Sequence, residues 1–204
     1  MSPDPEQSEP LAARPRRDSA ATKRRLLAAA TTEFAERGIA GARVDRIASA
    51  AQANKRLIYD YFGDKEGLFD AVMDANVERI IDAVPIDATD LPGYAGRLFT
   101  YAIDHPELLR LVTWARLERR LGPTARASSA QSYRHRLAAI EEAQGSGHLP
   151  TTFTPPQLLT LIESISVGWI TTTAPFVGAD EDDPSQHHET HREVVVETVR
   201  RLLT

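Results

Sequence analysis

The sequence predicts an all-α fold. Apolar residues recur every three or four positions along most of the 204 residues, which is the spacing of one face of a helix. Pro and Gly separate these segments at intervals of about one helix length, as they do in helical domains. No two neighbouring segments alternate apolar and polar residues, so the pattern contains no convincing pair of strands. With 42% hydrophobic residues, the chain can bury a substantial core.

The first helix is expected over residues 21–37. Leu26, Ala30 and Phe34 fall on one face of this segment, and charged side chains fall outside that face. Gly38 follows directly and is the residue type that most often ends a helix. The chain therefore opens its folded part with a long amphipathic helix.

Two short helices joined by a tight connection are expected next. The first covers residues 44–51, where Val44 and Ile47 recur at helical spacing. The second covers residues 54–61 and opens with Asn54, whose side chain can accept a hydrogen bond from a free amide of the first turn. Its aromatic residues would also suit a strand, but its helical neighbours favour a helix.

A fourth helix is expected from Asp64 to about Val84. The Asp64 carboxylate can cap the first free amides, Glu66 is well placed against the helix dipole, and Pro85 ends the helix. Further helices follow, and Pro stands at or near several of their starts. They are expected over residues 91–103, 106–121, 124–144, 155–177 and 185–203.

The most apolar stretch, residues 158–178, is long enough to raise the question of a membrane span. Glu163 and several Ser and Thr residues interrupt it, which favours a buried helix and no membrane partner. The first ten residues are acidic and Pro-rich and lack the apolar core of a signal peptide. The sequence has no cysteine, so it contains no disulfide framework. We therefore expect a cytoplasmic protein.

The basic residues are concentrated in the first third of the chain. Residues 14–65 contain twelve Lys or Arg against six Asp or Glu, whereas residues 66–204 contain twelve against twenty. Binding to phosphates needs positive charge only where the nucleic acid lies. A basic segment on an acidic body is therefore typical of a DNA-binding protein with a separate ligand or partner module. Taken alone, the asymmetry would also suit a chance drift in charge.

Basic and aromatic side chains gather around the two short helices in the pattern of a helix-turn-helix motif. Lys55 and Arg56 stand at the N-terminal end of the second short helix, where side chains reach base edges in the major groove, and Tyr59 follows one turn later. Lys65 lies in the first turn of the next helix, and Arg43 lies at the start of the first short helix. Both are placed to contact phosphates.

Residues 38–68, GIAGARVDRIASAAQANKRLIYDYFGDKEGL, resemble the N-terminal domain of the TetR family of bacterial transcriptional repressors. The resemblance extends over residues 21–69. The elements in the spacing of the family are Ile47, Ala48, Tyr59, Tyr61, Phe62, Lys65, Glu66 and Leu68. The resemblance implies a homodimer that represses transcription by binding a palindromic double-stranded DNA operator. It also implies a C-terminal domain that binds a small-molecule effector.

The resemblance divides the chain into three parts. Residues 1–19 are expected to be a disordered arm, residues 20–66 the helix-turn-helix DNA-binding domain, and residues 67–204 the effector-binding and dimerisation domain. The expected DNA contacts are Arg43, Gln52, Asn54, Lys55, Arg56, Tyr59 and Lys65.

The chain departs from the family pattern at the motif itself. Arg43 stands where the family usually has Thr or Ser, so the usual side-chain cap of the first short helix is lost. The usual Gly-Val-Ser of the turn is replaced by residues 52–54, and Gln52 must then take the turn conformation that Gly accepts freely, at a cost of about 1 kcal/mol if that conformation is left-handed. Arg56 replaces a residue that is commonly small. These departures are expected to affect which DNA sequence is read.

The C-terminal part offers candidates for two roles. An effector pocket among the middle helices would be lined by aromatic side chains and one arginine, although aromatic residues at helical spacing are more often core. These candidates are Phe99, Tyr101, Trp114, Arg116, Tyr133 and Trp169. Dimerisation is implied through the last two long helices. Its candidates are Leu158, Leu161, Ile162, Ile165, Val195, Val199 and Leu202, some of which must belong to the core of the subunit.

Other functions find less support. The basic segment from Arg14 to Arg17 would suit an arm in a minor groove or a solvated tail. His187 and His191 have a spacing that could bind zinc, but the H-E-x-x-H pattern of zinc proteases is absent, and we expect no metal, no cofactor and no enzymatic activity. The remaining alternatives are a helical DNA-binding or interaction protein without an effector and an all-helical enzyme.

Overall fold

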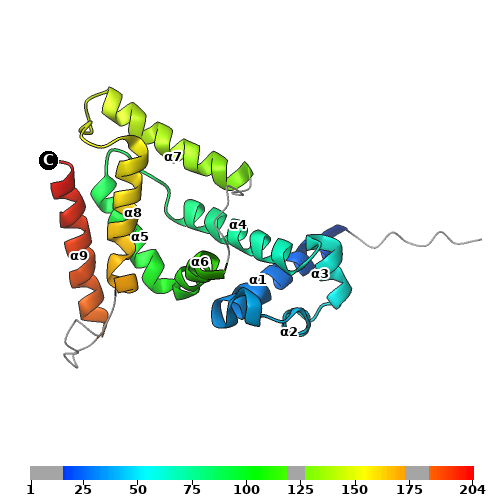
Figure 1. The fold of residues 1–204 in the computed structure, drawn as a ribbon. Helices are drawn as coiled ribbons and strands as arrows, with labels where there is room; N and C mark the ends of the chain where they lie inside the picture. Colours follow the sequence, from blue (N-terminus) through cyan, green and yellow to red (C-terminus); the bar gives the residue numbers. More distant parts are fainter. Residues whose placement is uncertain (1–15, 119–126, 173–183) are drawn as a thin grey trace, which may run out of the picture.

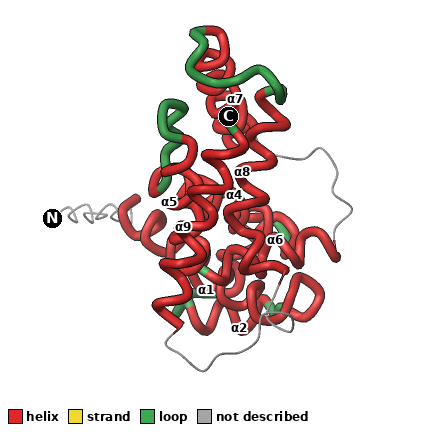
Figure 2. Tube along the Cα trace, turned by 90° about the vertical axis from the view of Figure 1, so that its left-hand side faces the viewer, coloured by secondary structure: helices red, strands yellow, loops and turns green. Residues whose placement is uncertain are grey.

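The computed structural model describes residues 16–118, 127–172 and 184–204, and within these ranges the only regular elements are helices (Figures 1 and 2). The helices are α1 (Arg16–Gly41), α2 (Val44–Ala50), α3 (Lys55–Phe62), α4 (Lys65–Ala83), α5 (Leu91–Asp104), α6 (Pro106–Glu118), α7 (Ala127–Gly145), α8 (Pro155–Thr172) and α9 (Pro184–Leu202). The predicted all-α class is therefore confirmed. Both views place α1 and α2 at one end of the molecule and the C-terminus at the other.

The expected helix bounds differ from the observed ones mainly at the first helix. Helix α1 begins at Arg16 instead of residue 21, so the expected end of the arm at residue 19 falls inside this helix. No side chain of the arm from Arg14 to Arg17 is described, and residues 1–15 lie outside the described residues altogether. The expected helix ends at residues 121 and 177 also lie outside them, as does the expected start at residue 124.

Gly38 interrupts the regular backbone of α1, as its place at the end of the predicted helix suggested. Its φ of 69° and ψ of 178° are non-helical, and the chain makes one more turn to Gly41. A Cβ atom at Gly38 would collide with the carboxylate of Glu118 and lie 2.9 Å from the ring of Trp114. This position therefore needs glycine both for its positive φ and for the close approach of α6.

The side-chain caps predicted at Asn54 and Asp64 are confirmed. Asn54 Oδ1 accepts a hydrogen bond from the amide of Arg56 at 2.9 Å, at the start of α3. Asp64 Oδ1 accepts one from the amide of Gly67 at 2.7 Å, at the start of α4. Each cap fixes the point at which a helix of the motif region begins.

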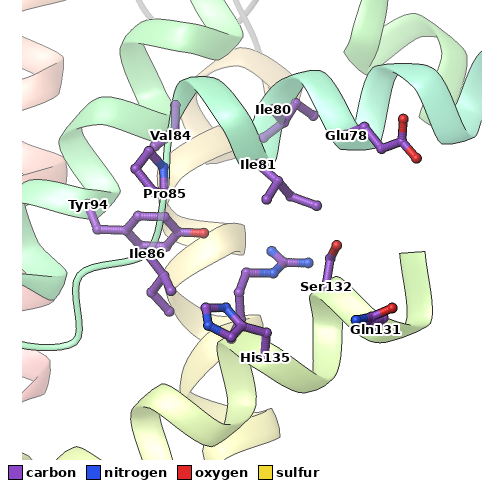
Figure 3. A pocket seen from close by; sticks show the side chains of 11 residues that line it. Glu78, Ile80, Ile81, Val84, Pro85, Ile86, Tyr94, Gln131, Ser132 and His135 are labelled. Atoms are coloured by element: carbon purple, nitrogen blue, oxygen red, sulfur yellow. The ribbon is translucent and has the colours of Figure 1, made fainter. Parts of the chain in front are cut away.

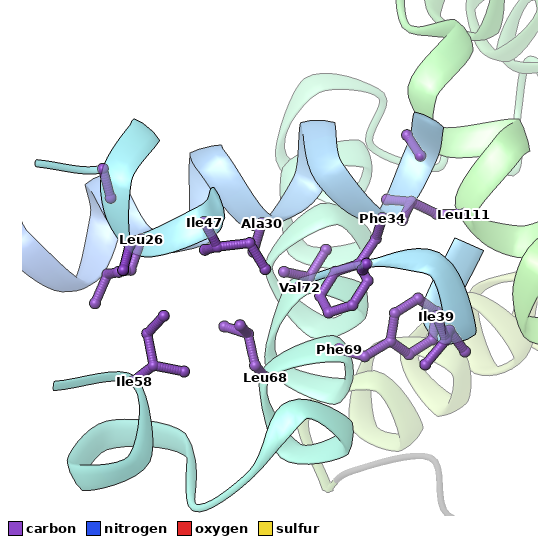
Figure 4. Packing of buried hydrophobic residues seen from close by; sticks show 14 residues of the cluster. Leu26, Ala30, Phe34, Ile39, Ile47, Ile58, Leu68, Phe69, Val72 and Leu111 are labelled. Atoms are coloured by element: carbon purple, nitrogen blue, oxygen red, sulfur yellow. The ribbon is translucent and has the colours of Figure 1, made fainter. Parts of the chain in front are cut away.

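The first four helices enclose an apolar core that also includes one residue of α6 (Figure 4). Phe34 of α1 and Phe69 of α4 meet edge to face, with ring centroids 5.1 Å apart. Ile47 of α2 and Ile58 of α3 are fully buried against them, and Leu111 extends the core to α6. The two short helices therefore hold their orientation through one fully buried isoleucine each.

A second apolar core lies among α5, α7, α8 and α9. Leu91, Tyr94 and Phe99 of α5 are almost completely buried in it. Helices α8 and α9 both pack on α5, and α7 packs on α8. No helix in the described ranges is both long and apolar enough to cross a membrane.

Helix α4 connects the two cores. Leu68 and Val72 lie in the first core, and Val84, directly after the helix, lies in the second. Between them, the buried amide of Asn76 donates to the carbonyl oxygen of Val72 at 2.7 Å and to Thr31 Oγ1 of α1 at 3.4 Å. Because a buried amide needs partners, Asn76 fixes how α4 lies along α1.

A nearly buried carboxylate joins α1 to α2. Glu33, whose side chain is only 10% exposed, accepts from Arg46 Nε at 2.7 Å and from the backbone amide of Arg43 at 3.0 Å. Burial alone would raise the pKa of Glu33, but these hydrogen bonds and the charges of Arg46 and Arg37 outweigh it and lower that pKa. The ionised carboxylate is therefore part of the folded structure.

We predict that Glu33→Gln lowers the free energy of unfolding at pH 7 by about 1 to 2 kcal/mol, because it weakens two charge-assisted hydrogen bonds. Since the pKa of Glu33 is lowered by folding, its contribution is complete above the ordinary value of 4.5 and is lost as the pH falls through the lower folded value. Urea unfolding from pH 7 downward should show a deficit that shrinks in acid. Glu36→Gln, at an exposed position of the same helix, is the control and should change stability by less than about 0.5 kcal/mol.

Candidate nucleic-acid interface

The turn between α2 and α3 has a left-handed residue at the position that the sequence predicted. Gln52 has a φ of 50°, and it is the only residue other than glycine with a positive φ in the described ranges. The amide of Gln52 donates to the carbonyl oxygen of Ser49 at 3.0 Å, and that of Ala53 donates to Ala48 at 2.9 Å. Arg25 of α1 donates from Nε to the carbonyl oxygen of Ala51 at 3.1 Å. The turn is therefore held by its own backbone hydrogen bonds and by a hydrogen bond from α1.

Helix α3 presents a polar face because its apolar face is anchored. Ile58 is completely buried, and Leu57 and Phe62 are half-buried against the first core. Lys55 and Arg56 are exposed at the N-terminal end of the helix. Tyr59, one turn later, is 45% exposed although it is a large aromatic residue.

Each of the two basic residues at the start of α3 has an acidic neighbour. Lys55 Nζ lies 2.8 Å from Asp45 of α2, and this hydrogen bond raises the pKa of Lys55. Arg56 Nε lies 3.8 Å from Asp60, one turn along the same helix. Asp45 was missing from the sequence prediction because it is ten residues away from Lys55, and only the turn brings them together. The positive charge of this surface is thus partly compensated.

Arg43 and Lys65 occupy different positions at the edge of the motif. Arg43 is the N-cap residue of α2, its side chain is exposed, and it makes no side-chain capping bond, as the sequence predicted. Lys65 is half-buried, and its ammonium donates to the carbonyl oxygens of Ala40 at 3.4 Å and Ala42 at 3.5 Å. These carbonyl oxygens lie at the C-terminal end of α1. Lys65 therefore stabilises the fold independently of any contact with DNA.

Six of the seven predicted DNA contacts are exposed, and the seventh, Lys65, is half-buried. The six come from the start of α2, the turn and α3, which are adjacent along the chain and packed on each other. Lys, Arg and Tyr on a protruding short helix, with the polar residues of the turn beside them, can donate to phosphates and to base edges. This surface is the candidate interface.

Two cavities lie where the end of α4 meets the later helices. One of about 370 Å³ lies among α4, α5, α6, α7 and α8, and it is lined by Tyr101 and Arg116 among the predicted effector residues. Another of about 390 Å³ lies between the end of α4, α5 and α7, and Tyr94, Ile86 and His135 are among its lining residues (Figure 3). The residues of the second cavity were not predicted, because three separate segments supply them.

The other four predicted effector residues line neither of these cavities. Phe99 belongs to the second core, and Trp114 Nε1 donates to the carbonyl oxygen of Ala35 at 3.3 Å. Tyr133 is 39% exposed on α7. Trp169 is 41% exposed and stacks on His191, with ring centroids 4.2 Å apart. Their contacts are packing contacts, and their role toward an effector stays a prediction.

The predicted dimerisation residues divide into two groups. Leu158, Ile162, Val195 and Val199 are buried inside the single subunit, so they offer no surface to a second one. Leu161, Ile165 and Leu202 are half-buried and can still contribute.

The described residues contain no group of three His, Asp or Glu side chains that could hold a metal ion. The side chain of His187 lies outside them, so the predicted pair of His187 and His191 is not described. The chain has no cysteine that could serve instead.

Two family models match the chain. The model described as bacterial regulatory proteins, tetR family, matches residues 26–72, which include α2, α3 and the turn. The model described as tetracyclin repressor-like, C-terminal domain, matches residues 90–201, more than half of the chain.

Similar proteins are regulators of transcription by name. The HTH-type transcriptional repressor SCO4008 of Streptomyces coelicolor is 40% identical over 151 residues, which are 74% of this chain and 79% of that protein. The HTH-type transcriptional repressor NicS of Pseudomonas putida is 30% identical over 138 residues, 62% of this chain and 65% of that protein. The crystal structure of the transcriptional regulator SCO4942 of Streptomyces coelicolor superposes on this structure with a TM-score of 0.73. The two chains are 36% identical in sequence, and the match covers 89% of this chain and 97% of that chain.

We predict that Gln52→Gly raises the free energy of unfolding by about 1 kcal/mol, because glycine removes the cost of a left-handed side chain. Gln52→Ala keeps the Cβ atom and is the matched control, so it should give no comparable gain. Urea unfolding of the three proteins measures the difference. Equal stability of the glycine and alanine variants would contradict the role that we assign to this backbone conformation.

Proposed function

We propose, from the premise that this chain belongs to the TetR family of bacterial transcriptional regulators, that it represses transcription by binding a palindromic operator as a homodimer until a small-molecule effector releases it. Membership of the family makes the chain a TetR-like regulator, and its curated relatives are named repressors. One observation supports the DNA-binding role above all others. It is the exposed set of Lys55, Arg56 and Tyr59 on a short helix anchored by the buried Ile58.

In the proposed complex, α3 enters the major groove. Lys55 and Arg56 stand at its N-terminal end, from which long side chains reach base edges, while the neighbouring Asn54 is already engaged as the cap. Arg43 and Tyr59 are placed to contact phosphates on either side. Gln52 lies at the turn between α2 and α3, so a substitution there changes one exposed side chain of the proposed interface.

Asp45 gives the proposed interface a further property. Its carboxylate holds Lys55 in the free protein, and it would itself be repelled by a phosphate. DNA must draw Lys55 away from this carboxylate before the lysine can be used, and a base edge that accepts a hydrogen bond offers such a partner. We therefore assign Asp45 to the reading of sequence, beside the residues predicted from the chain alone.

A dimer would present two copies of α3 to successive major grooves, about 34 Å apart on DNA. Helices α8 and α9 are the proposed dimer surface, because both pack on α5 and still carry partly exposed large apolar side chains. These are Trp169, at 41% exposed, and Val194, at 43% exposed. The half-buried Leu161 is a further contributor from α8.

An effector would act by binding the C-terminal half better in a conformation that does not fit DNA. Helices α4 and α6 both link a cavity to the DNA-binding half. Helix α4 lies in the first core and leads directly to Val84 in the second, and α6 lines the cavity of about 370 Å³ while Trp114 and Glu118 contact the end of α1. The proposed route for the effector signal therefore includes α6 as well as α4.

The alternatives make different predictions. A DNA-binding or interaction protein without an effector would leave the cavities empty under all conditions, and an enzyme would show multiple turnover of a substrate. The names of the relatives describe transcriptional repressors. They therefore give no support to the effector-free protein or to the enzyme. A regulator of this kind acts where the chromosome lies, so we expect it in the cytoplasm. Footprinting of the DNA bound across the genome would identify the operator and its neighbouring genes.

We predict that Tyr59→Ala and Lys55→Ala each weaken operator binding by about 5-fold to 150-fold, which corresponds to one lost contact of about 1 to 3 kcal/mol. Arg43→Ala should weaken binding to all sequences alike and reduce the slope of log affinity against log salt by about 1. Fluorescence anisotropy with a footprinted fragment measures both quantities. Arg134→Ala, at an exposed position of α7, is the control. Unchanged binding in the three interface variants would rule out this surface.

We predict that Val194→Asp shifts the protein from dimer to monomer, because it places a charge at the centre of the proposed apolar contact. Its 43% exposure allows the substitution without a loss of fold. Sedimentation velocity measures the association, and circular dichroism checks the fold. Leu117→Asp on α6, where the side chain is 72% exposed, is the control and should leave the dimer intact.

A further inference from the structure

The cavity of about 370 Å³ has apolar walls and a small number of polar side chains. Three helices, α4, α5 and α6, supply most of the walls. The main wall residues are Val77, Ile80, Ile81, Leu98, Leu108 and Val112. This composition is typical of a site that excludes water from most of a ligand and orients it by a few polar contacts.

Arg136 of α7 lines this cavity and also the cavity of about 390 Å³. Its side chain is 17% exposed, and its Nη1 donates to Glu163 Oε1 of α8 at 2.5 Å. Its Nε is buried and has no hydrogen-bond partner. A buried donor without an acceptor is unfavourable, and more so when the group is charged. The edge of the guanidinium that contains Nε is therefore available to an acceptor that the protein does not supply.

The hydroxyl of Tyr101 is a second buried group without a partner among the residues that line the cavity. Burial raises the pKa of Tyr101, so the hydroxyl keeps its proton at neutral pH and remains a donor. Both unpaired groups of the cavity thus offer hydrogens, and neither has an acceptor. Their common requirement is a ligand with oxygen acceptors.

The charges around the cavity favour an anion. Arg116 and Arg136 line it together with one acidic residue, Glu163. The Glu163 side chain is 42% exposed, so water stabilises its charge in part, whereas Arg136 lies deeper. Two positive groups against one partly hydrated negative group leave an excess of positive charge.

We propose that this cavity binds a small amphipathic carboxylate. The ligand carboxylate accepts from the Nε edge of Arg136, where guanidinium and carboxylate can form two parallel hydrogen bonds. Glu163 continues to accept the hydrogen bond from Nη1 of Arg136. The apolar part of the ligand fills the space between α4, α5 and α6. This assignment deepens the proposed function, because it names the chemical class of the effector.

Glu163 has two opposite effects in this proposal, and they make it testable. It orients Arg136, and as a neighbouring anion it opposes a second carboxylate. Glu163→Gln keeps an oxygen acceptor for Nη1 and removes the negative charge. A carboxylate should therefore bind this variant more tightly, whereas a neutral ligand should not.

The test is isothermal titration calorimetry of the full-length protein with octanoate and with 1-octanol, which share a chain and differ in the head group. The wild type should bind octanoate at least about tenfold more tightly than 1-octanol. Arg136→Met should lose this preference, Tyr101→Phe should weaken octanoate binding by a few-fold, and Glu163→Gln should strengthen it. Arg134→Met, on the exposed side of the same helix, is the matched control and should bind as the wild type does.

Equal binding of octanoate and 1-octanol, or no binding of octanoate, would overturn the assignment. So would parallel losses in Arg136→Met and Glu163→Gln, since the ion pair would then matter only for packing. Operator binding by the same samples, measured by fluorescence anisotropy, separates this failure from a failure of the proposed function. A protein that binds its operator and ignores octanoate is still a regulator, whereas one that binds no DNA is not.

Discussion

The end of helix α1 is the constraint on which the other helices depend. Gly38 breaks the regular backbone there, and Glu118 of α6 accepts a hydrogen bond from the freed amide of Ala40 at 2.6 Å. Lys65 of α4 donates to the carbonyls of the same turn, and Glu33 receives α2 through Arg43 and Arg46. Helices α2, α4 and α6 thus attach within about three turns of α1. Their positions are set relative to one another because they are set relative to α1.

Local features of this arrangement could be predicted from the sequence. The caps at Asn54 and Asp64, the break at Gly38 and the left-handed Gln52 each follow from the chemistry of one residue and its neighbours in the chain. These signals do not require knowledge of which helix packs on which.

Contacts between distant residues could not be predicted in the same way. The partner of Lys55 on α2, the carbonyls that receive Lys65 and the residues of both cavities depend on the crossing of helices, which spacing along one helix does not encode. For the same reason, amphipathic spacing identified the apolar faces of α8 and α9 but not the helix on which these faces pack. Val195 and Val199 face α5 and the core of the subunit, while Val194 is the residue left exposed.

The pairing of Lys55 with Asp45 has a consequence for how such a protein searches a genome. Any DNA-binding protein spends most of its time among an excess of wrong sites, held there by sequence-independent attraction to phosphates. In the proposed complex, a carboxylate beside α3 weakens that attraction at every site, and a base that accepts from Lys55 offsets the loss only at the correct one. A protein built in this way would leave random DNA sooner. Its selectivity would then come from a weaker background as well as from the contacts at the correct site.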